Sequence, residues 1–192
     1  MIAEIGQFVL ILALVLAVIQ ATLPLWGAAR GDTALMTLAD RTAVGQAVAL
    51  LIAFGALTHG FVTSDFSLTV VFQNSHSLKP MLYKVSGVWG NHEGSMLLWV
   101  LVLALFSAAV ALFGRNLPPS LRARVLAVQA MIGVGFLAFV IFTSNPFARI
   151  SPTPLDGTGL NPLLQDPGLA FHPPLLYLGY VGFSMAFSFA VA

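Results

Sequence analysis

The chain has 192 residues, of which 58% are hydrophobic and only 8% are charged, with a formal net charge of +1. A soluble domain carries roughly 25% charged residues to cover its surface, so the composition excludes an ordinary soluble domain and indicates a membrane protein. The small net charge and the lack of a long basic run exclude nucleic acid as a partner. The sequence has no cysteine, which excludes disulfides, thiolate metal sites and covalent haem attachment to this chain. Its four histidines are left as candidate metal or haem ligands.

Five apolar stretches are long enough to cross a hydrocarbon core about 30 Å thick, which takes about 20 helical residues. They cover residues 7–26, 43–62, 95–113, 125–142 and 175–192. We therefore predict an all-α, polytopic transmembrane protein in which residues 1–192 form a single membrane domain. Glu4 is the only early charged side chain, which favours a retained first helix over a cleaved signal peptide. The last stretch is still apolar at Ala192, so we expect this chain to be the N-terminal part of a larger protein.

The loops predict how the chain is oriented in the membrane. Lys and Arg concentrate in short cytoplasmic loops, and the two short loops hold Arg30, Arg41, Arg115, Arg122 and Arg124. The two long loops, residues 63–94 and 143–174, hold only Lys79, Lys84 and Arg149. We therefore expect the N-terminus and both long loops to lie on the outer face, which is the periplasm for a bacterial inner membrane. The apolar and aromatic residues in both loops predict folded segments on the membrane face.

His172 is the sharpest candidate ligand, because it precedes Pro173 and Pro174 at the start of the fifth apolar stretch. Proline suits the first helical turn, and a residue before proline favours an extended backbone. The pattern therefore predicts that His172 lies near the helix N-cap, at the membrane interface, on a stiff mount. An imidazole there could be an axial ligand of haem iron. The alternative is a histidine that caps the helix or bonds the loop.

A second candidate site is the segment from Val88 to Ser95, which leads into the third apolar stretch. Its glycines permit the close approach of a flat ligand, Trp89 offers a stacking face, and Glu93 is a possible acceptor for the imidazole N–H of His92. The spacing is not that of an HExxH zinc motif. A capped aromatic turn at the membrane interface explains the same residues and is the reading that the sequence alone favours.

The two remaining histidines are weaker candidates. His59 stands alone at the outer end of an apolar helix, where a structural hydrogen bond is the usual role of a histidine. His76 lies in a polar turn, and we expect it to be solvated.

Several segments together resemble the CcmF/NrfE family of cytochrome c-type biogenesis proteins, which are membrane subunits of the bacterial haem lyase. The most specific segment is Asn161-Pro-Leu-Leu-Gln-Asp-Pro-Gly-Leu-Ala-Phe-His-Pro-Pro-Leu-Leu-Tyr177. The others are Tyr83-Lys84 with Trp89-Gly90 and His92-Glu-Gly-Ser95, Thr143-Ser-Asn-Pro-Phe147, and Pro24-Leu-Trp-Gly27 with Arg30-Gly-Asp32. The resemblance runs from about Glu4 to Ala192.

The resemblance implies a function in cytochrome c maturation at the outer membrane face. Haem b would be the cofactor, His172 an axial ligand of its iron, and the reaction the formation of thioether bonds between haem vinyl groups and apocytochrome c. Trp89 and His92 are further candidates for haem contact. The expected partners are apocytochrome c, a haem chaperone, other cytochrome c maturation subunits and membrane lipid. The family's tryptophan-rich segment and its other haem-binding histidines lie beyond Ala192, so this chain alone is not expected to be an active lyase.

Two other functions fit parts of the sequence. A transporter for haem or another small molecule would carry ionisable residues or broken helices at mid-membrane depth, and these apolar stretches carry almost no ionisable residues. A respiratory subunit would need a second histidine opposite His172. His59 is available, but nothing in the sequence pairs the two.

Overall fold

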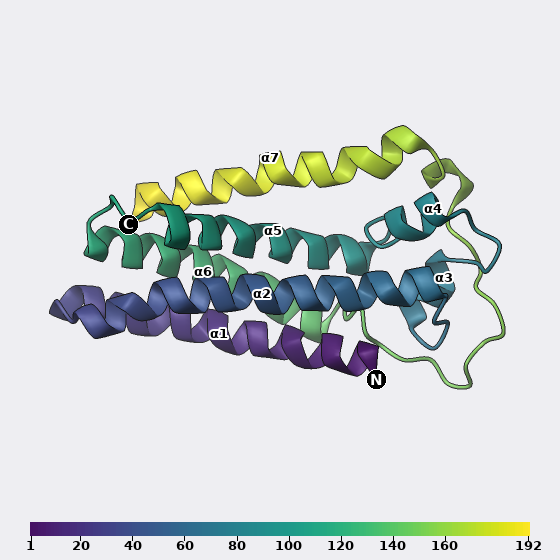
Figure 1. Ribbon diagram of the computed structural model, residues 1–192, viewed down its shortest axis with the longest axis horizontal. Helices are drawn as coiled ribbons and strands as arrows, with labels where there is room; N and C mark the ends of the chain where they lie inside the picture. The colour runs from purple at the N-terminus through teal and green to yellow at the C-terminus, as the bar shows by residue number, and fades with distance from the viewer.

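The computed structural model describes the backbone of residues 1–192 and every side chain except that of Leu169. Five long antiparallel helices make up the fold (Figure 1). They are α1 (Ile2–Arg30), α2 (Thr33–Thr63), α5 (His92–Phe113), α6 (Pro119–Phe142) and α7 (Pro167–Val191). Each contains a stretch long and apolar enough to cross a membrane. The predicted all-α, polytopic fold with about five spans is confirmed.

The two ends of the bundle differ in their connections. At one end, here called the hairpin end, α1 joins α2 and α5 joins α6 through short turns. At the other, here called the loop end, lie the N-terminus of the chain and the two long connections, residues 64–91 and 143–166 (Figure 1). These contain the short helices α3 (Thr69–Asn74) and α4 (Met81–Ser86) and the 3₁₀ turn η1 (Pro162–Leu164). Both long loops therefore lie at one end of the bundle.

The helices extend beyond the apolar stretches that predicted them. Thr33 begins α2, ten residues before the predicted start, because the Asp32 side chain caps that helix by accepting from the N–H groups of Ala34 and Leu35 at 2.9 and 3.2 Å. Gly31 ends α1 with a φ of 71°, which glycine adopts without strain. Hydropathy thus marked where the chain is apolar, whereas caps mark where the helices end.

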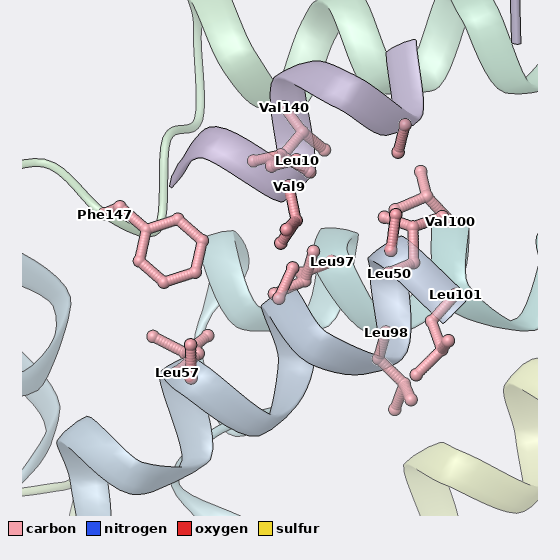
Figure 2. Close-up of a cluster of buried hydrophobic side chains, with 14 of the residues drawn as sticks. Val9, Leu10, Leu50, Leu57, Leu97, Leu98, Val100, Leu101, Val140 and Phe147 are labelled. Atoms are coloured by element: carbon pink, nitrogen blue, oxygen red, sulfur yellow. The ribbon is translucent and has the colours of Figure 1, made fainter. Parts of the chain in front are cut away.

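Small residues let α1, α2 and α6 approach closely, as is usual where lipid provides no hydrophobic force between helices. Larger side chains fill the core nearer the loop end. Val9, Leu10, Leu50, Leu97 and Phe147 belong to one buried cluster there (Figure 2). Alanines that are buried in the three helices include Ala13, Ala17 and Ala21 on α1, Ala43, Ala47 and Ala53 on α2, and Ala123, Ala127 and Ala130 on α6.

Buried glutamines add polar contacts between the helices. The Gln46 side chain donates to Oε1 of Gln20 at 2.6 Å, and Gln20 donates to the Leu126 carbonyl at 2.9 Å, which joins α1, α2 and α6. Gln129 on α6 donates to Ser184 and accepts from Ser188, both at 2.8 Å, which joins α6 to α7. Each of these glutamines therefore has a partner inside the bundle.

Helix α7 packs on α5 and α6 at one side of the bundle (Figure 1). Only 11% of its apolar stretch is buried, against 39–50% for the other four helices. Most of its large side chains, such as Leu175, Tyr180 and Phe183, are exposed. Helix α7 thus presents one face to the bundle and leaves a broad apolar face uncovered.

The two long loops are folded against each other. The N–H groups of Thr158 and Gly159 donate to the carbonyls of Phe72 and Ser75 at 2.8 and 3.1 Å, which satisfies acceptors at the C-terminal end of α3. The Asp156 carboxylate accepts from the backbone N–H and the hydroxyl of Ser77 at 2.9 and 2.5 Å. The prediction of folded loops is confirmed.

Candidate functional site

The N-terminal turns of α7 differ from the prediction. The helix begins at Pro167, so His172, Pro173 and Pro174 lie inside it and His172 is not near the N-cap. The preceding Asp166 offers its backbone carbonyl to the N–H of Ala170 at 2.9 Å, as the first intrahelical bond requires. Asp before Pro is itself a signal for a helix start, with Pro at the first helical position. The sequence prediction placed the start of this helix at Pro173 and Pro174 instead of at Pro167.

His172 is exposed and faces away from the bundle. Ala170 is 2% exposed and marks the inward side of α7. Successive residues of an α-helix are rotated by about 100°, which places His172 about 200° around the helix from Ala170. The same rotation brings Leu176, Gly179 and Phe183 onto the line of His172. At Gly179 the space that a side chain would fill is open. The imidazole therefore stands at the loop end of an uncovered, apolar helix face.

The turn from Val88 to Ser95 is capped by its own side chains. Asn91 is the N-cap of α5: its Oδ1 accepts from the Gly94 N–H and its Nδ2 donates to the Gly87 carbonyl, both at 2.7 Å. A Cβ at Gly94 would lie 1.6 Å from the Val88 carbonyl oxygen, so glycine is needed there for the turn to close. The structure therefore shows a capped aromatic turn, and this glycine serves the backbone rather than a ligand.

Trp89 joins this turn to α7. Its indole Nε1 donates to the carbonyl oxygen of Ala170 at 2.8 Å. Its own carbonyl accepts from the Ser95 hydroxyl at 2.6 Å, and the Tyr177 hydroxyl donates to Ser95 at 3.1 Å. The turn is thus attached to α7 at Ala170 and at Tyr177, which lie on the same side of that helix.

A cleft of about 480 Å³ opens between this turn, the second long loop (residues 143–166) and α7. Trp99 and Tyr177 line it, and the Trp99 ring stacks on Phe136 of α6 and contacts Tyr177 of α7, with ring centroids 5.7 and 5.4 Å apart. The Ser86 hydroxyl is buried there and has no hydrogen-bond partner among the described protein atoms. The rest of the cleft lining is mainly aromatic and apolar, and includes Trp89, Met96, Trp99, Leu160, Pro173 and Tyr177.

His92 is the first residue of α5 and is exposed. It lines this cleft and also a second, apolar groove of about 560 Å³ along α6. Its ring meets the Phe139 ring edge-on, with centroids 6.0 Å apart. Met96, one helical turn further along α5, lines the same two hollows. His92 therefore stands where the two hollows meet.

The structure brings Trp89 and His92 together but separates both from His172. Trp89 and His92 line the cleft on the inward side of α7, whereas His172 lies on the outward side. A single flat ring cannot be coordinated by His172 and stacked on Trp89 in this arrangement. The two candidate sites named from the sequence therefore lie on different sides of α7.

A cluster of charges at the loop end was missed by the sequence analysis. The Arg149 guanidinium pairs with Glu4, lies 3.7 Å from Asp65 and donates to the Ser67 hydroxyl. These contacts attach the second long loop to α1 and to the segment that follows α2. A carboxylate near the start of an apolar helix and a lone arginine in a distant loop were the available signals.

Two lysines of the first long loop are also buried. Lys79 donates to the Asn74 carbonyl at 2.9 Å, and Lys84 donates to the Ser64 hydroxyl at 2.8 Å. Burial, with the neighbouring Lys84 charge, lowers the pKa of the Lys79 ammonium to about 8. Both ammonium groups therefore donate hydrogen bonds within the first long loop.

The other two histidines, His59 and His76, lie outside the cleft and the groove. His59 is exposed on α2. His76 accepts from the Leu78 N–H at 3.2 Å and lies 3.6 Å from the Asp156 carboxylate, so it has protein partners as well as solvent. Hydrogen bonds from Ser77 lower the pKa of Asp156 to about 2. Among the described residues, no three His, Cys, Asp or Glu side chains gather as a metal site would require.

Comparison with known proteins defines the class. The family model described as cytochrome C assembly protein matches residues 89–192, a segment that begins at Trp89 and includes His92 and His172. The chain belongs to the cytochrome c assembly protein family. The resemblance found in the sequence is confirmed.

Particular relatives match the whole chain. It is 66% identical over 192 residues to the cytochrome c-type biogenesis protein ccl1 of Rhodobacter capsulatus and covers 29% of that protein. It is 51% identical to the cytochrome c-type biogenesis protein CcmF of Escherichia coli and covers 30% of it. A solved structure of the cytochrome c haem lyase CcmF superposes with a TM-score of 0.86 at 29% identity, over all of this chain and 30% of that one. The chain thus corresponds to the N-terminal part of much longer relatives.

Proposed function

We propose that this chain is the N-terminal membrane portion of a cytochrome c haem lyase, and that it presents His172 as an axial ligand to haem iron at the outer face of the bacterial inner membrane. Family membership supports the role in cytochrome c assembly. The observation that carries the assignment of His172 is its exposure on the outward face of α7.

The residues around His172 fit a flat, apolar cofactor. The imidazole is exposed, and Gly179, two turns along the same helix face, leaves open space beside the helix. Haem b, when bound, would supply the vinyl groups that form thioether bonds. His172 would hold the iron, while Leu176 and Phe183 would offer apolar surface to the ring. The second ligand and the tryptophan-rich segment of the family would come from sequence outside this chain.

The distribution of charge supports an outward-facing loop end. The hairpin end carries five arginines: Arg30, Arg41, Arg115, Arg122 and Arg124. At the loop end, Lys79 and Lys84 are buried and Arg149 is paired with carboxylates. Cytoplasmic loops carry the excess of cations. The loop end would then lie in the periplasm, where apocytochrome c, a haem chaperone and other maturation subunits would meet it.

The cleft at Trp89 and His92 would be a second contact surface, for haem or for a protein partner. The stacked rings of Trp99 and Phe136 and the imidazole of His92 support this role. Changing His92 to Ala in the full-length protein should lower the yield of c-type cytochromes. A full yield would remove His92 from haem handling and leave the cleft with a packing role.

The transporter alternative finds less support. A coupled carrier needs ionisable groups at mid-membrane depth. In the part of the chain that the structure describes, the buried polar side chains joining α1, α2 and α6 are glutamines that bond to one another or to backbone. They stabilise helix contacts and offer no route for an ion.

The decisive test is His172→Ala in the full-length protein in its own host, with His59→Ala as a matched control from another exposed, loop-end histidine. Membranes are stained for covalent haem after denaturing electrophoresis, at equal amounts of lyase. We expect loss of the c-type bands for His172→Ala and full bands for His59→Ala. Full bands in both would overturn the proposed role of His172. Loss in both would instead indicate a paired bis-histidine site.

A further inference from the structure

Helix α7 carries two adjacent prolines in its interior, Pro173 and Pro174. Each lacks the N–H that would donate to the carbonyl four residues earlier. Pro174 therefore leaves the carbonyl of Ala170 without its intrahelical donor. Ala170 is 2% exposed, and an unpaired buried carbonyl is costly in free energy. The fold must supply a donor from outside the helix.

Trp89 supplies it. The indole N–H lies 2.8 Å from the Ala170 oxygen, and the turn that carries Trp89 is held by the cap of Asn91 and by the bond from Ser95. The donor is thus on a rigid support. In Figure 1, α4 and the start of α7 lie next to each other at the loop end, and the Trp89 turn directly follows α4.

Among the side chains that the structure describes, few are buried in this part of α7. Only 11% of its apolar stretch is buried, so few side-chain contacts resist rotation of the helix about its axis. The polar contacts from α5 and α6 lie further along it: Tyr177 bonds to Ser95, and Ser184 and Ser188 bond to Gln129. His172 stands between Ala170 and Tyr177 on the opposite side. Of these hydrogen bonds to α7, the one at Ala170 is the nearest to His172 along the helix.

We propose that Trp89 is a positioning residue for His172: its indole N–H fills the acceptor that Pro174 leaves open and so fixes the rotation of the turn that presents the imidazole. This inference rests on the proposed role of His172 in holding haem. Trp89 then acts through the helix and does not touch the haem that His172 binds. The indole ring, half-buried in the cleft, serves to place the donor.

The prolines allow a direct test in the full-length protein. Trp89→Phe keeps an aromatic ring and removes the N–H. Pro174→Ala restores a backbone N–H that can donate to the Ala170 carbonyl, which makes the indole unnecessary. Pro173→Ala is the matched control, because its new N–H is directed to the carbonyl of residue 169 instead.

We expect Trp89→Phe to lower the covalent haem yield per lyase about tenfold, since one buried hydrogen bond is lost. The double variant Trp89→Phe/Pro174→Ala should give the same yield as Pro174→Ala alone. The double variant Trp89→Phe/Pro173→Ala should keep the low yield of Trp89→Phe. The visible absorption spectrum of haem trapped on the lyase should shift in Trp89→Phe and return in the Pro174→Ala double variant. A general loss of packing would not show this selective rescue.

Three results would overturn the inference while leaving the role of His172 intact. They are a wild-type yield in Trp89→Phe, equal rescue by both alanine substitutions, and no rescue by either. If Trp89→Phe lowers the amount of lyase in the membrane, the comparison moves to the Pro174→Ala background, where Trp89→Phe should change neither amount nor yield. A loss there also overturns it. A wild-type yield in His172→Ala, measured in parallel, would overturn the proposed function and this inference together.

Discussion

Helices α1 and α7 are both apolar, but they are held in different ways. The apolar stretch of α1 is 39% buried, and alanines bring it close to α2 and α6, whereas that of α7 is 11% buried. Helix α7 is attached through a few polar bonds, at Ala170, Tyr177, Ser184 and Ser188. Close packing of small residues forms the scaffold, and hydrogen bonds orient the helix that carries the candidate ligand.

The largest effect is expected where packing is tight. Ala17 on α1 is fully buried, so Ala17→Leu must force the helices apart and should lower the free energy of unfolding by about 2–3 kcal/mol. Unfolding in detergent with increasing denaturant measures this change. Val15→Leu, on the exposed side of the same helix, is the control and should be nearly neutral. Equal effects at both positions would mean that small residues do not set the approach of the helices.

A smaller effect is expected where α7 meets α6. Gln129→Leu removes the bonds to Ser184 and Ser188 and should destabilise the protein by about 1 kcal/mol, as interhelical hydrogen bonds in membranes typically contribute. A triple variant that also carries Ser184→Ala and Ser188→Ala should lose little more, because the three side chains act as one unit. Additive losses in the same unfolding assay would contradict that coupling.

The smallest effect should appear as a dependence on pH at the loop end. The folded state lowers the pKa of Lys79 from 10.5 to about 8, so above pH 8 the unfolded chain holds more protons than the folded one. Stability should therefore rise between about pH 8 and 10.5, and the cost of the buried charge is fully present below pH 8. Lys79→Met should flatten this part of the profile of melting temperature against pH. An unchanged slope in that variant would assign the dependence to other groups.

The five helices were predictable because an apolar stretch of about 20 residues has few other folds available in a membrane. Their ends were not, because they depend on caps such as Asp32 and Asn91 rather than on hydropathy. The early start of α7 at Pro167 moved His172 from the helix end to its second turn.

The candidate site was only partly predictable for a related reason. Each residue type could be read from the sequence, but the side of α7 on which it lies could not. Trp89 and His172 are separated by the rotation of one helix, which depends on contacts such as the indole bond to Ala170. The charge cluster at Arg149 depends on a contact with Glu4 across 145 positions, which no local pattern reveals.

The fold of the second long loop affects how the protein can be cut and labelled. Leu155 is fully exposed at its tip, while Arg149 on one side and Asp156 and Thr158 on the other bind to separate parts of the loop end. A protease added from that side would meet the tip first. Because both flanks stay attached, the nicked chain should remain one particle in mild detergent and separate into two fragments only after denaturation. The same tip would accept an inserted epitope, so the loop end could be labelled without disturbing α7.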